Sequence, residues 1–390
     1  MPYLDHAATT PLRPEARAAW IEAQATGNPS SVHADGQRAR RILEDARERV
    51  AAVLDCDRLE VVFTSGGTEA INLALKGLWW ARREGADAVV LPDGEHHATM
   101  DAAEWLRAAG AEVRPVPLDG FGRIRADRFA DELAGGAAWA TALAANNEVG
   151  TINDVDALAT ASAAAGVPLH IDAVAAFGHT PVSFRSWRGD APPGAGLVAL
   201  SVSGHKVGAP VGTGALVVAR TAALSPLLHG GGQQRGLRAG TQDVAGASAL
   251  AVAVELAQRE RAAESARLAG LRARLIAALG ADPRIRLLGD PNRRLEANTH
   301  LLLPGASGES VLYLLDMAGV SASTGSACQA GVTEASHVVE AMGISGAAPR
   351  QVLRLTMGRS TTAEDVDVAA RAILDAYARL VPPGADPAAS

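Results

Sequence analysis

Short apolar segments alternate with stretches of helical periodicity over the first 250 residues. Residues 37–55 carry apolar side chains at helical spacing on a charged background, which is typical of an amphipathic helix. Further helices are predicted from Glu69 to Trp80 and from about Thr99. Short apolar runs predict buried strands at 60–64, 88–91, 140–145, 167–171 and 197–202. This alternation predicts a largely parallel sheet covered by helices on both faces.

The pattern changes at about Glu255, where long helices rich in Arg, Ala and Leu precede a short strand near 300–303. We therefore expect an α/β protein of two domains. The large domain would span 15–255, and a smaller α+β domain would combine 1–14 with 256–380. Residues 381–390 are expected to be a disordered tail.

Polar residues gather where each predicted strand ends. They are Ser65-Gly66-Gly67-Thr68, Asp93-Gly94-Glu95-His96-His97, Asn146-Asn147-Glu148, Asp172 and Ser203-Gly204-His205-Lys206. Ligands of open α/β sheets bind at the carboxyl edge of the strands. Five such clusters on one edge predict a single binding site.

Composition excludes several classes of protein. The net charge of -7 gives no support for a nucleic-acid binder. The sequence has no run of eighteen apolar residues, so a membrane-spanning helix is not expected. The N-terminus has neither the basic nor the apolar region of a signal peptide, so a cytoplasmic location is expected. Cys56 and Cys328 are the only cysteines and lie far apart, which argues against a disulfide scaffold or a metal site.

Two of the clusters have the composition of a phosphate and amine site. Gly67 and Thr68 lie at a strand-to-helix junction, where backbone N–H groups, the helix dipole and a hydroxyl can bind a phosphate. An ordinary helix cap with turn glycines is the alternative. Lys206 follows a buried strand, and desolvation there would free its amine to form an imine. A solvated loop lysine is the alternative, although only Lys76 and Lys206 occur in the chain.

Asp172 and His96 complete the pattern. A carboxylate at the end of an apolar strand is suited to pairing with a pyridinium nitrogen, although a helix cap is the competing interpretation. His96 could stack on an aromatic ring and move protons, with His97 as the local rival. Phosphate loop, imine lysine, acid and histidine together indicate one cofactor, pyridoxal phosphate (PLP).

Motifs over nearly the whole chain carry a family resemblance. They are Leu4-Asp5-His6-Ala7-Ala8-Thr9-Thr10-Pro11, Gly27-Asn28-Pro29-Ser30-Ser31, Phe63-Thr64-Ser65-Gly66-Gly67-Thr68-Glu69, Glu95-His96-His97-Ala98, Ala145-Asn146-Asn147-Glu148-Val149-Gly150, Ser203-Gly204-His205-Lys206, Gly230-Gly231-Gly232-Gln233, Arg238-Ala239-Gly240-Thr241, Ser323-Thr324-Gly325-Ser326-Ala327-Cys328 and Leu353-Arg354-Leu355-Thr356-Met357-Gly358-Arg359. The chain resembles the cysteine desulfurases of the nitrogen-fixation and iron–sulfur-assembly type, within the class V aminotransferase superfamily. The resemblance implies the PLP-dependent transferase fold type I, with a mostly parallel seven-stranded sheet flanked by helices.

The resemblance also implies a role for each matching residue. Lys206 would hold PLP and transfer protons, His96 would stack on the ring, and Asp172 would pair with the ring nitrogen. Asn147 would contact the ring hydroxyl or the substrate carboxylate, which Arg354 would bind in bidentate geometry. Without the family, Arg354 is more typical of a structural ion pair. The phosphate would be bound by Thr68, Ser203 and His205, and by Thr241 from the second subunit of a homodimer.

Cys328 determines the reaction type that the resemblance implies. It lies among small residues that suggest an exposed, mobile loop, whereas Cys56 is typical of a small buried hydrophobe. The substrate would be L-cysteine, whose sulfur would pass to Cys328 as a persulfide and leave L-alanine. The persulfide would then travel to an acceptor, which could be an iron–sulfur scaffold, a tRNA-thiolation enzyme or another thio-cofactor pathway.

Three departures from the family keep alternatives open. Ala175 stands where a glutamine usually donates to the ring hydroxyl, Asn153-Asp154 replaces the usual Gln-Pro, and His6 replaces an asparagine. The alternatives are a selenocysteine lyase, a β-eliminating or amino-transfer enzyme, and a low-activity scaffold that binds a sulfur-carrier partner.

Overall fold

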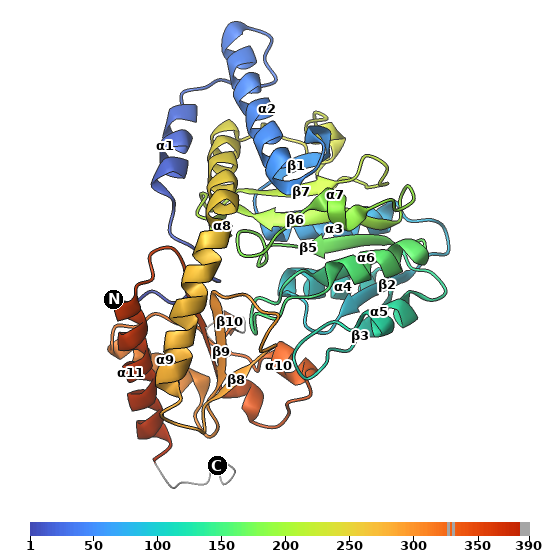
Figure 1. The fold of residues 1–390 in the computed structure, drawn as a ribbon. Coiled ribbons are helices and arrows are strands. Elements are labelled where there is room, and N and C mark those ends of the chain that lie inside the picture. Colours follow the sequence, from blue (N-terminus) through green and yellow to red (C-terminus); the bar gives the residue numbers. More distant parts are fainter. Residues whose placement is uncertain (326–327, 330–331, 383–390) are drawn as a thin grey trace.

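The fold is built around a seven-stranded sheet with the strand order β1-β7-β6-β5-β4-β2-β3 (Figure 1). A computed structural model describes residues 1–325, 328–329 and 332–382, of which 328–329 and 332–333 are described by their backbone alone. Neighbouring strands are parallel except where β7 pairs with β1 and with β6. Because both neighbours of β7 run against it, the other six strands share one direction.

The strands of this sheet are β1 (Val61–Thr64), β2 (Ala88–Pro92), β3 (Glu112–Val116), β4 (Trp139–Leu143), β5 (Pro168–Asp172), β6 (Gly196–Ser203) and β7 (Gly214–Val218). The helices between them are α3 (Gly67–Trp80), α4 (His97–Ala108), α5 (Ala126–Leu133), α6 (Val155–Ala164) and α7 (Phe184–Arg188). Helices α3 and α4 pack together on one face, and α5, α6 and α7 pack along the other (Figure 1). The expected α/β architecture, a mostly parallel sheet flanked by helices, is confirmed.

The five strands predicted from apolar runs are all present, within two residues at either end. Strands β3 and β7 were not predicted. The first is an edge strand with mostly exposed side chains and a proline, so it lacks the apolar run of a buried strand. The second follows a glycine-rich turn and runs against its neighbours, whereas the prediction relied on the strand–helix alternation of parallel sheets.

A second part of the molecule lies beside the sheet and is reached along one long helix, α8 (Val244–Leu279). Its three-stranded sheet is antiparallel, with the order β12-β9-β8. Its elements are β8 (Arg286–Leu288), β9 (Asn298–Leu302), α9 (Gly308–Met317), β10 (Cys328–Gln329), β11 (Val332–Thr333), α10 (His337–Ala341), β12 (Val352–Thr356) and α11 (Ala363–Leu380). The N-terminal segment joins it, since Tyr3 and Asp5 form bridges to Ser321 and Thr356.

The two parts have separate hydrophobic cores. Helices α1 (Pro14–Ala23) and α2 (Ala34–Leu54) contribute to the larger core around the seven-stranded sheet. The second core lies between the three-stranded sheet, α9, α11 and the end of α8. The expected domain division at 255/256 falls inside α8, whose first half packs into one core and whose last turns pack into the other. No helix in the described residues is long and apolar enough to cross a membrane.

Candidate active site

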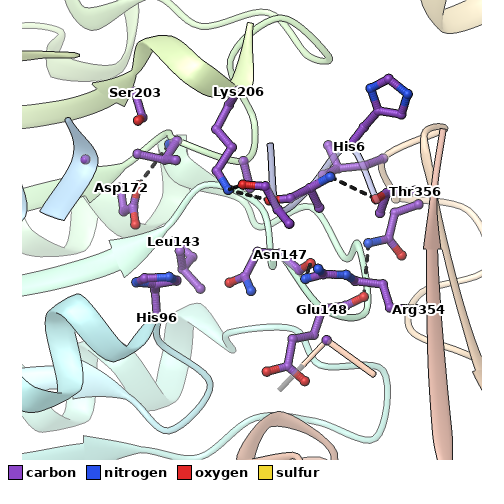
Figure 2. Close-up of a pocket in the computed structure, with 18 of the residues that line it drawn as sticks. His6, His96, Leu143, Asn147, Glu148, Asp172, Ser203, Lys206, Arg354 and Thr356 are labelled. Atoms are coloured by element: carbon purple, nitrogen blue, oxygen red, sulfur yellow. Dashed lines mark hydrogen bonds between the residues drawn. The ribbon is translucent and has the colours of Figure 1, made fainter. Parts of the chain in front are cut away.

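The five polar clusters meet in one cavity at the carboxyl edge of the parallel strands. The cavity has a volume of about 380 Å³ and is closed on its far side by the N-terminal segment and β12. Of the residues singled out from the sequence, Gly67, Thr68, His96, Asn147, Asp172, Ser203, His205, Lys206 and Arg354 line it. Figure 2 shows His96 and Asp172 on one side, Arg354 on the other and Lys206 between them.

Lys206 is held by backbone carbonyl groups of the N-terminal segment. Its ammonium group donates to the carbonyl oxygens of Ala7 and Ala8, the latter at 2.9 Å. The short helical turn Gly204–Lys206 directly after β6 positions this side chain. Burial and the nearby Arg354 guanidinium lower the pKa of the Lys206 amine to about 8, although Asp5 and Asp172 oppose the shift. A substantial fraction of the amine is therefore unprotonated near neutral pH.

Asp172 is the last residue of β5 and is almost completely buried. Its carboxylate accepts a hydrogen bond of 2.8 Å from the Val174 backbone N–H. Burial raises the pKa of Asp172 to about 6, and the Val174 N–H and the Lys206 charge limit the rise. Glu95 also faces this region, and burial together with Asp172 raises its pKa to about 8. At neutral pH Asp172 thus lines the cavity as a buried carboxylate, and the Glu95 carboxyl, which does not line the cavity, is mostly protonated nearby.

The junction of β1 and α3 forms one end of the cavity. Gly66 has φ = 149°, a conformation that favours glycine, and it turns the chain so that α3 begins at Gly67. A Cβ on Gly67 would lie 2.9 Å from Val174 Cγ2, so a side chain there would have to displace its neighbour. The Ser203 hydroxyl is buried beside this junction and has no hydrogen-bond partner among the described residues. Backbone N–H groups, Thr68 and an unpaired hydroxyl therefore converge where the helix N-terminus favours negative charge.

His205 points from the same turn, where its Nδ1 lies 3.3 Å from the Thr9 hydroxyl. Burial and the neighbouring Lys206 charge lower its pKa to about 4, so the ring is neutral at pH 7.

His96 lies on the opposite side of the cavity and caps α4. Its Nδ1 accepts a 3.0 Å hydrogen bond from the Ala98 backbone N–H, so the proton of the neutral ring is on Nε2. Burial and the Lys206 charge lower the pKa of His96 to about 4. His97, the rival candidate, also lines the cavity but packs edge-on against His337, with ring centroids 5.0 Å apart. The capping bond fixes the His96 ring, which makes it the better placed of the two.

Arg354 closes the cavity from β12. One guanidinium nitrogen pairs with the Asp5 carboxylate at 3.0 Å, and another donates to the Asn147 carbonyl oxygen at 3.1 Å. The remaining nitrogen, Nε, is buried without a hydrogen-bond partner among the described residues. The structural ion pair considered from the sequence is thus present, between Arg354 and Asp5. The Nε–H group of Arg354 still has no partner among the described residues and could bind a ligand.

Two predicted site residues are not among those that line the cavity. Thr241 is exposed just before α8, away from the lining residues. Cys328 lies in β10, but its side chain, like the expected tail from residue 383 onward, lies outside the described part of the structure. The described residues contain no group of three or more acidic, histidine or cysteine side chains placed to bind a metal.

Sequence reasoning missed several groups in the cavity wall and directly behind it. The carbonyl groups of Ala7 and Ala8, the Asp5 carboxylate and the Glu95 carboxyl were assigned no role, although Asp5 and Glu95 lie within the motifs quoted above. His337 was also missed; its Nε2 donates to the Glu95 carbonyl oxygen at 2.9 Å. These groups matter through backbone carbonyl contacts, through burial or through contacts between distant parts of the chain. A pattern of residue types along the sequence predicts none of these.

The cavity fits PLP in its donor set. The unpaired Ser203 hydroxyl and the N-terminus of α3 fit a phosphate, and Asp172 fits a ring nitrogen. Figure 2 shows the lysine amine, whose pKa is lowered, between Asp172 and Arg354, with the His96 ring on the Asp172 side. A phosphate would provide the missing partner of the Ser203 hydroxyl, and a pyridine nitrogen would provide a partner for Asp172.

Comparisons with known proteins agree with this geometry. The model of the family "Aminotransferase class-V" matches residues 2–368. An IscS-like cysteine desulfurase of Mycobacterium tuberculosis is 42% identical over 97% of both chains. Among solved structures, a NifS-like protein has a TM-score of 0.88 at 29% identity, covering 97% of this chain and 99% of that one. The structure titled "SspA in complex with cysteine" has a TM-score of 0.80 at 28% identity, covering 92% and 99%. The chain belongs to the class-V aminotransferase family, among the PLP-dependent cysteine desulfurases of the IscS and NifS type.

Proposed function

We propose that this protein converts L-cysteine and its own Cys328 thiol into L-alanine and a Cys328 persulfide. One sulfur atom moves from substrate to enzyme, the C–S bond of the substrate breaks and an S–S bond forms, so atoms and electrons balance. The observation that carries the proposal is the joint placement of Lys206, Asp172 and Arg354 around one cavity of suitable size. The cysteine bound in the SspA structure, a relative of the same fold, supports L-cysteine as the substrate.

Bound PLP would supply an electron sink that weakens the bonds at the α- and β-carbons of the substrate. Asp172 sustains this chemistry by pairing with the ring nitrogen, which it can do as a carboxylate above its pKa of about 6. Ser203, Thr68 and the N-terminus of α3 hold the phosphate, and His205 adds a further donor from the same turn.

Lys206 and His96 are the groups that move protons. The Lys206 amine, with a pKa of about 8, exchanges protons readily near neutral pH. The carbonyl groups of Ala7 and Ala8 hold this amine in place whenever it is free. His96 presents its Nε2 proton, since Nδ1 accepts the capping bond, so it offers a proton donor to the substrate.

Arg354 and Asn147 bind the substrate carboxylate. The unpaired Nε of Arg354 is a buried donor that a carboxylate oxygen would satisfy. Asp5 holds the guanidinium group in its orientation through the 3.0 Å ion pair. Ala175, at the position of the usual glutamine, lines the cavity as an apolar side chain, so Asn147 alone addresses the ring hydroxyl.

The wider context is part of the same proposal. A homodimer would bring Thr241 of each subunit to the phosphate of the other, which agrees with the exposure of Thr241 in the single chain. The Cys328 persulfide would pass to an acceptor protein that serves iron–sulfur cluster assembly or tRNA thiolation. A chain with only two cysteines, far apart in sequence, suits a reducing cytoplasm.

The test is product analysis of the PLP-loaded protein with L-cysteine and a thiol reductant. We expect alanine and sulfide in equal amounts, and no product from a Lys206→Ala variant. Pyruvate and ammonia in place of alanine would identify a β-eliminating lyase. Turnover of L-selenocysteine alone would identify a selenocysteine lyase, and PLP binding without any product would identify a scaffold.

A further inference from the structure

Three polar side chains cross the middle of the seven-stranded sheet behind the proposed PLP site. Thr141 on β4, His170 on β5 and Ser201 on β6 are each completely buried. The Thr141 hydroxyl lies 2.8 Å from Nδ1 of His170, and the Ser201 hydroxyl lies 3.0 Å from its Nε2. Apolar side chains dominate these strands, and polar groups in such a core are costly unless they are hydrogen-bonded.

This chain of hydrogen bonds ends at Ser201, which lies beside Asp172 on the neighbouring strand. Residues 170 and 172 of β5 point to the same face of the sheet because side chains alternate along a strand. Ser201 is the register partner of Asp172, and Thr141 is the register partner of His170. Hydrogen bonding from the Ser201 side chain to the Asp172 carboxylate lowers the pKa of Asp172 against the effect of burial.

A hydrogen bond from Ser201 to Asp172 would fix the positions of the other protons in the chain. Burial lowers the pKa of His170 to about 3, so the ring is neutral and has one donor and one acceptor nitrogen. If Ser201 donates to Asp172, its oxygen accepts from Nε2–H of His170. Nδ1 then accepts from the Thr141 hydroxyl. Every hydrogen bond therefore points toward the Asp172 carboxylate.

We propose that Thr141, His170 and Ser201 form a directional hydrogen-bond relay that keeps Asp172 ionised and fixes its orientation toward the nitrogen of the bound ring. The three are positioning residues, since none of them lines the cavity. The proposal rests on the proposed function, in which Asp172 pairs with that nitrogen.

The charged and titratable groups around Asp172 show why a relay is needed. Lys206, from the turn after β6, favours the carboxylate through its charge. Glu95, before α4, disfavours a second charge nearby. His170, on β5 itself, is neutral. Hydrogen bonds from the Ser201 hydroxyl and the Val174 N–H also oppose the effect of burial, before any cofactor pairs with the carboxylate.

The experiment compares Ser201→Ala with Ser162→Ala in the full-length protein. Ser162 is an equally buried serine on α6, and its hydroxyl donates to the Val167 carbonyl oxygen at 3.1 Å. The control variant therefore removes one hydroxyl and one hydrogen bond away from the relay. Three quantities are measured: the dissociation constant for PLP, the visible absorbance of the bound cofactor against pH, and the acid limb of kcat/KM.

We expect Ser201→Ala to weaken PLP binding about tenfold or more and to move the acid limb up by about one pH unit, because a hydrogen bond to a charged group is lost. Ser162→Ala should change neither. His170→Gln, whose amide can still donate to Ser201, should retain most of the wild-type behaviour, whereas His170→Leu should match Ser201→Ala.

Equal PLP affinity and equal pH profiles in Ser201→Ala and Ser162→Ala would overturn the relay. So would a His170→Leu variant that folds and keeps the wild-type pH profile. A wild-type protein that binds no PLP would instead overturn the proposed function, which keeps the two failures distinguishable.

Discussion

The lowered pKa of Lys206 can be measured directly because the chain has only two lysines. Lys206 and Lys76 lie far apart in sequence, so a digest separates them and one can serve as the reference for the other. We expect trace acetylation of Lys206 in the cofactor-free protein to rise with pH and to reach a plateau with a midpoint of about 8. The reason is that burial and the Arg354 guanidinium disfavour the ammonium form.

The size of the effect follows from the two pKa values. With a pKa of about 8, about a quarter of Lys206 is unprotonated at pH 7.5, whereas an ordinary lysine near 10.5 would be unprotonated about one time in a thousand. The reactive fraction therefore rises roughly two-hundredfold. Asp5→Asn should lower the midpoint further, since the Asp5 carboxylate favours the ammonium form.

The assay is mass spectrometry of the two lysine peptides after trace labelling over a range of pH. Reaction with PLP followed by borohydride should block Lys206 and leave Lys76 available, which assigns the cofactor lysine in the same experiment. A Lys206 midpoint near 10.5, or a midpoint that rises in Asp5→Asn, would refute the reasoning.

Three further predictions concern the buried charges. Asp172→Asn should abolish most of the activity. The same substitution should raise the free energy of unfolding of the cofactor-free chain at pH 7.5 by on the order of 2 kcal/mol, measured in urea. The reason is that the raised pKa of Asp172 means that burying its charge costs stability. That gain in stability should disappear below about pH 4, where the wild-type Asp172 carboxyl is protonated in both the folded and the unfolded state. A gain that persists at lower pH would contradict the prediction. Arg354→Gln should raise KM for L-cysteine about tenfold or more by loss of a charge-assisted hydrogen bond, and an unchanged KM would remove Arg354 from the substrate site. In the wild type, the affinity of the cofactor-free chain for PLP should fall as the pH drops through about 6, as Asp172 takes up a proton, and a flat profile down to pH 5 would refute the assignment.

The central strands and the position of the site could be predicted because both depend on local patterns. Strand β6, for example, is an eight-residue buried run that ends in the glycine-rich turn before Lys206. Strand β3 lacks alternation and fully buries only Val116, and its pairing with β2 is a tertiary property. The start of α4 was placed too late, since the capping bond of His96 begins the helix at His97.

The contacts that tune the site could not be predicted in the same way. The Ala7 and Ala8 carbonyl groups meet Lys206 across about 200 residues of sequence, and Asp5 meets Arg354 across 349. The buried environment that raises the pKa of Asp172 and of Glu95 arises only in the folded chain. Sequence patterns identify such residues, but the folded chain determines their protonation.

Cys56 offers a control for the central claim, the transfer of sulfur to Cys328. It is half-buried, and burial together with its acidic neighbours raises the pKa of its thiol to about 12, so it is a poor nucleophile.

The measurement is mass spectrometry of the PLP-loaded protein after L-cysteine is added without reductant and free thiols are alkylated. The account predicts one added sulfur atom on the Cys328 peptide and none on the Cys56 peptide. It also predicts full sulfide release by Cys56→Ser and none by Cys328→Ala, with PLP still bound in both. Equal sulfide release by Cys328→Ala and the wild type would contradict the account.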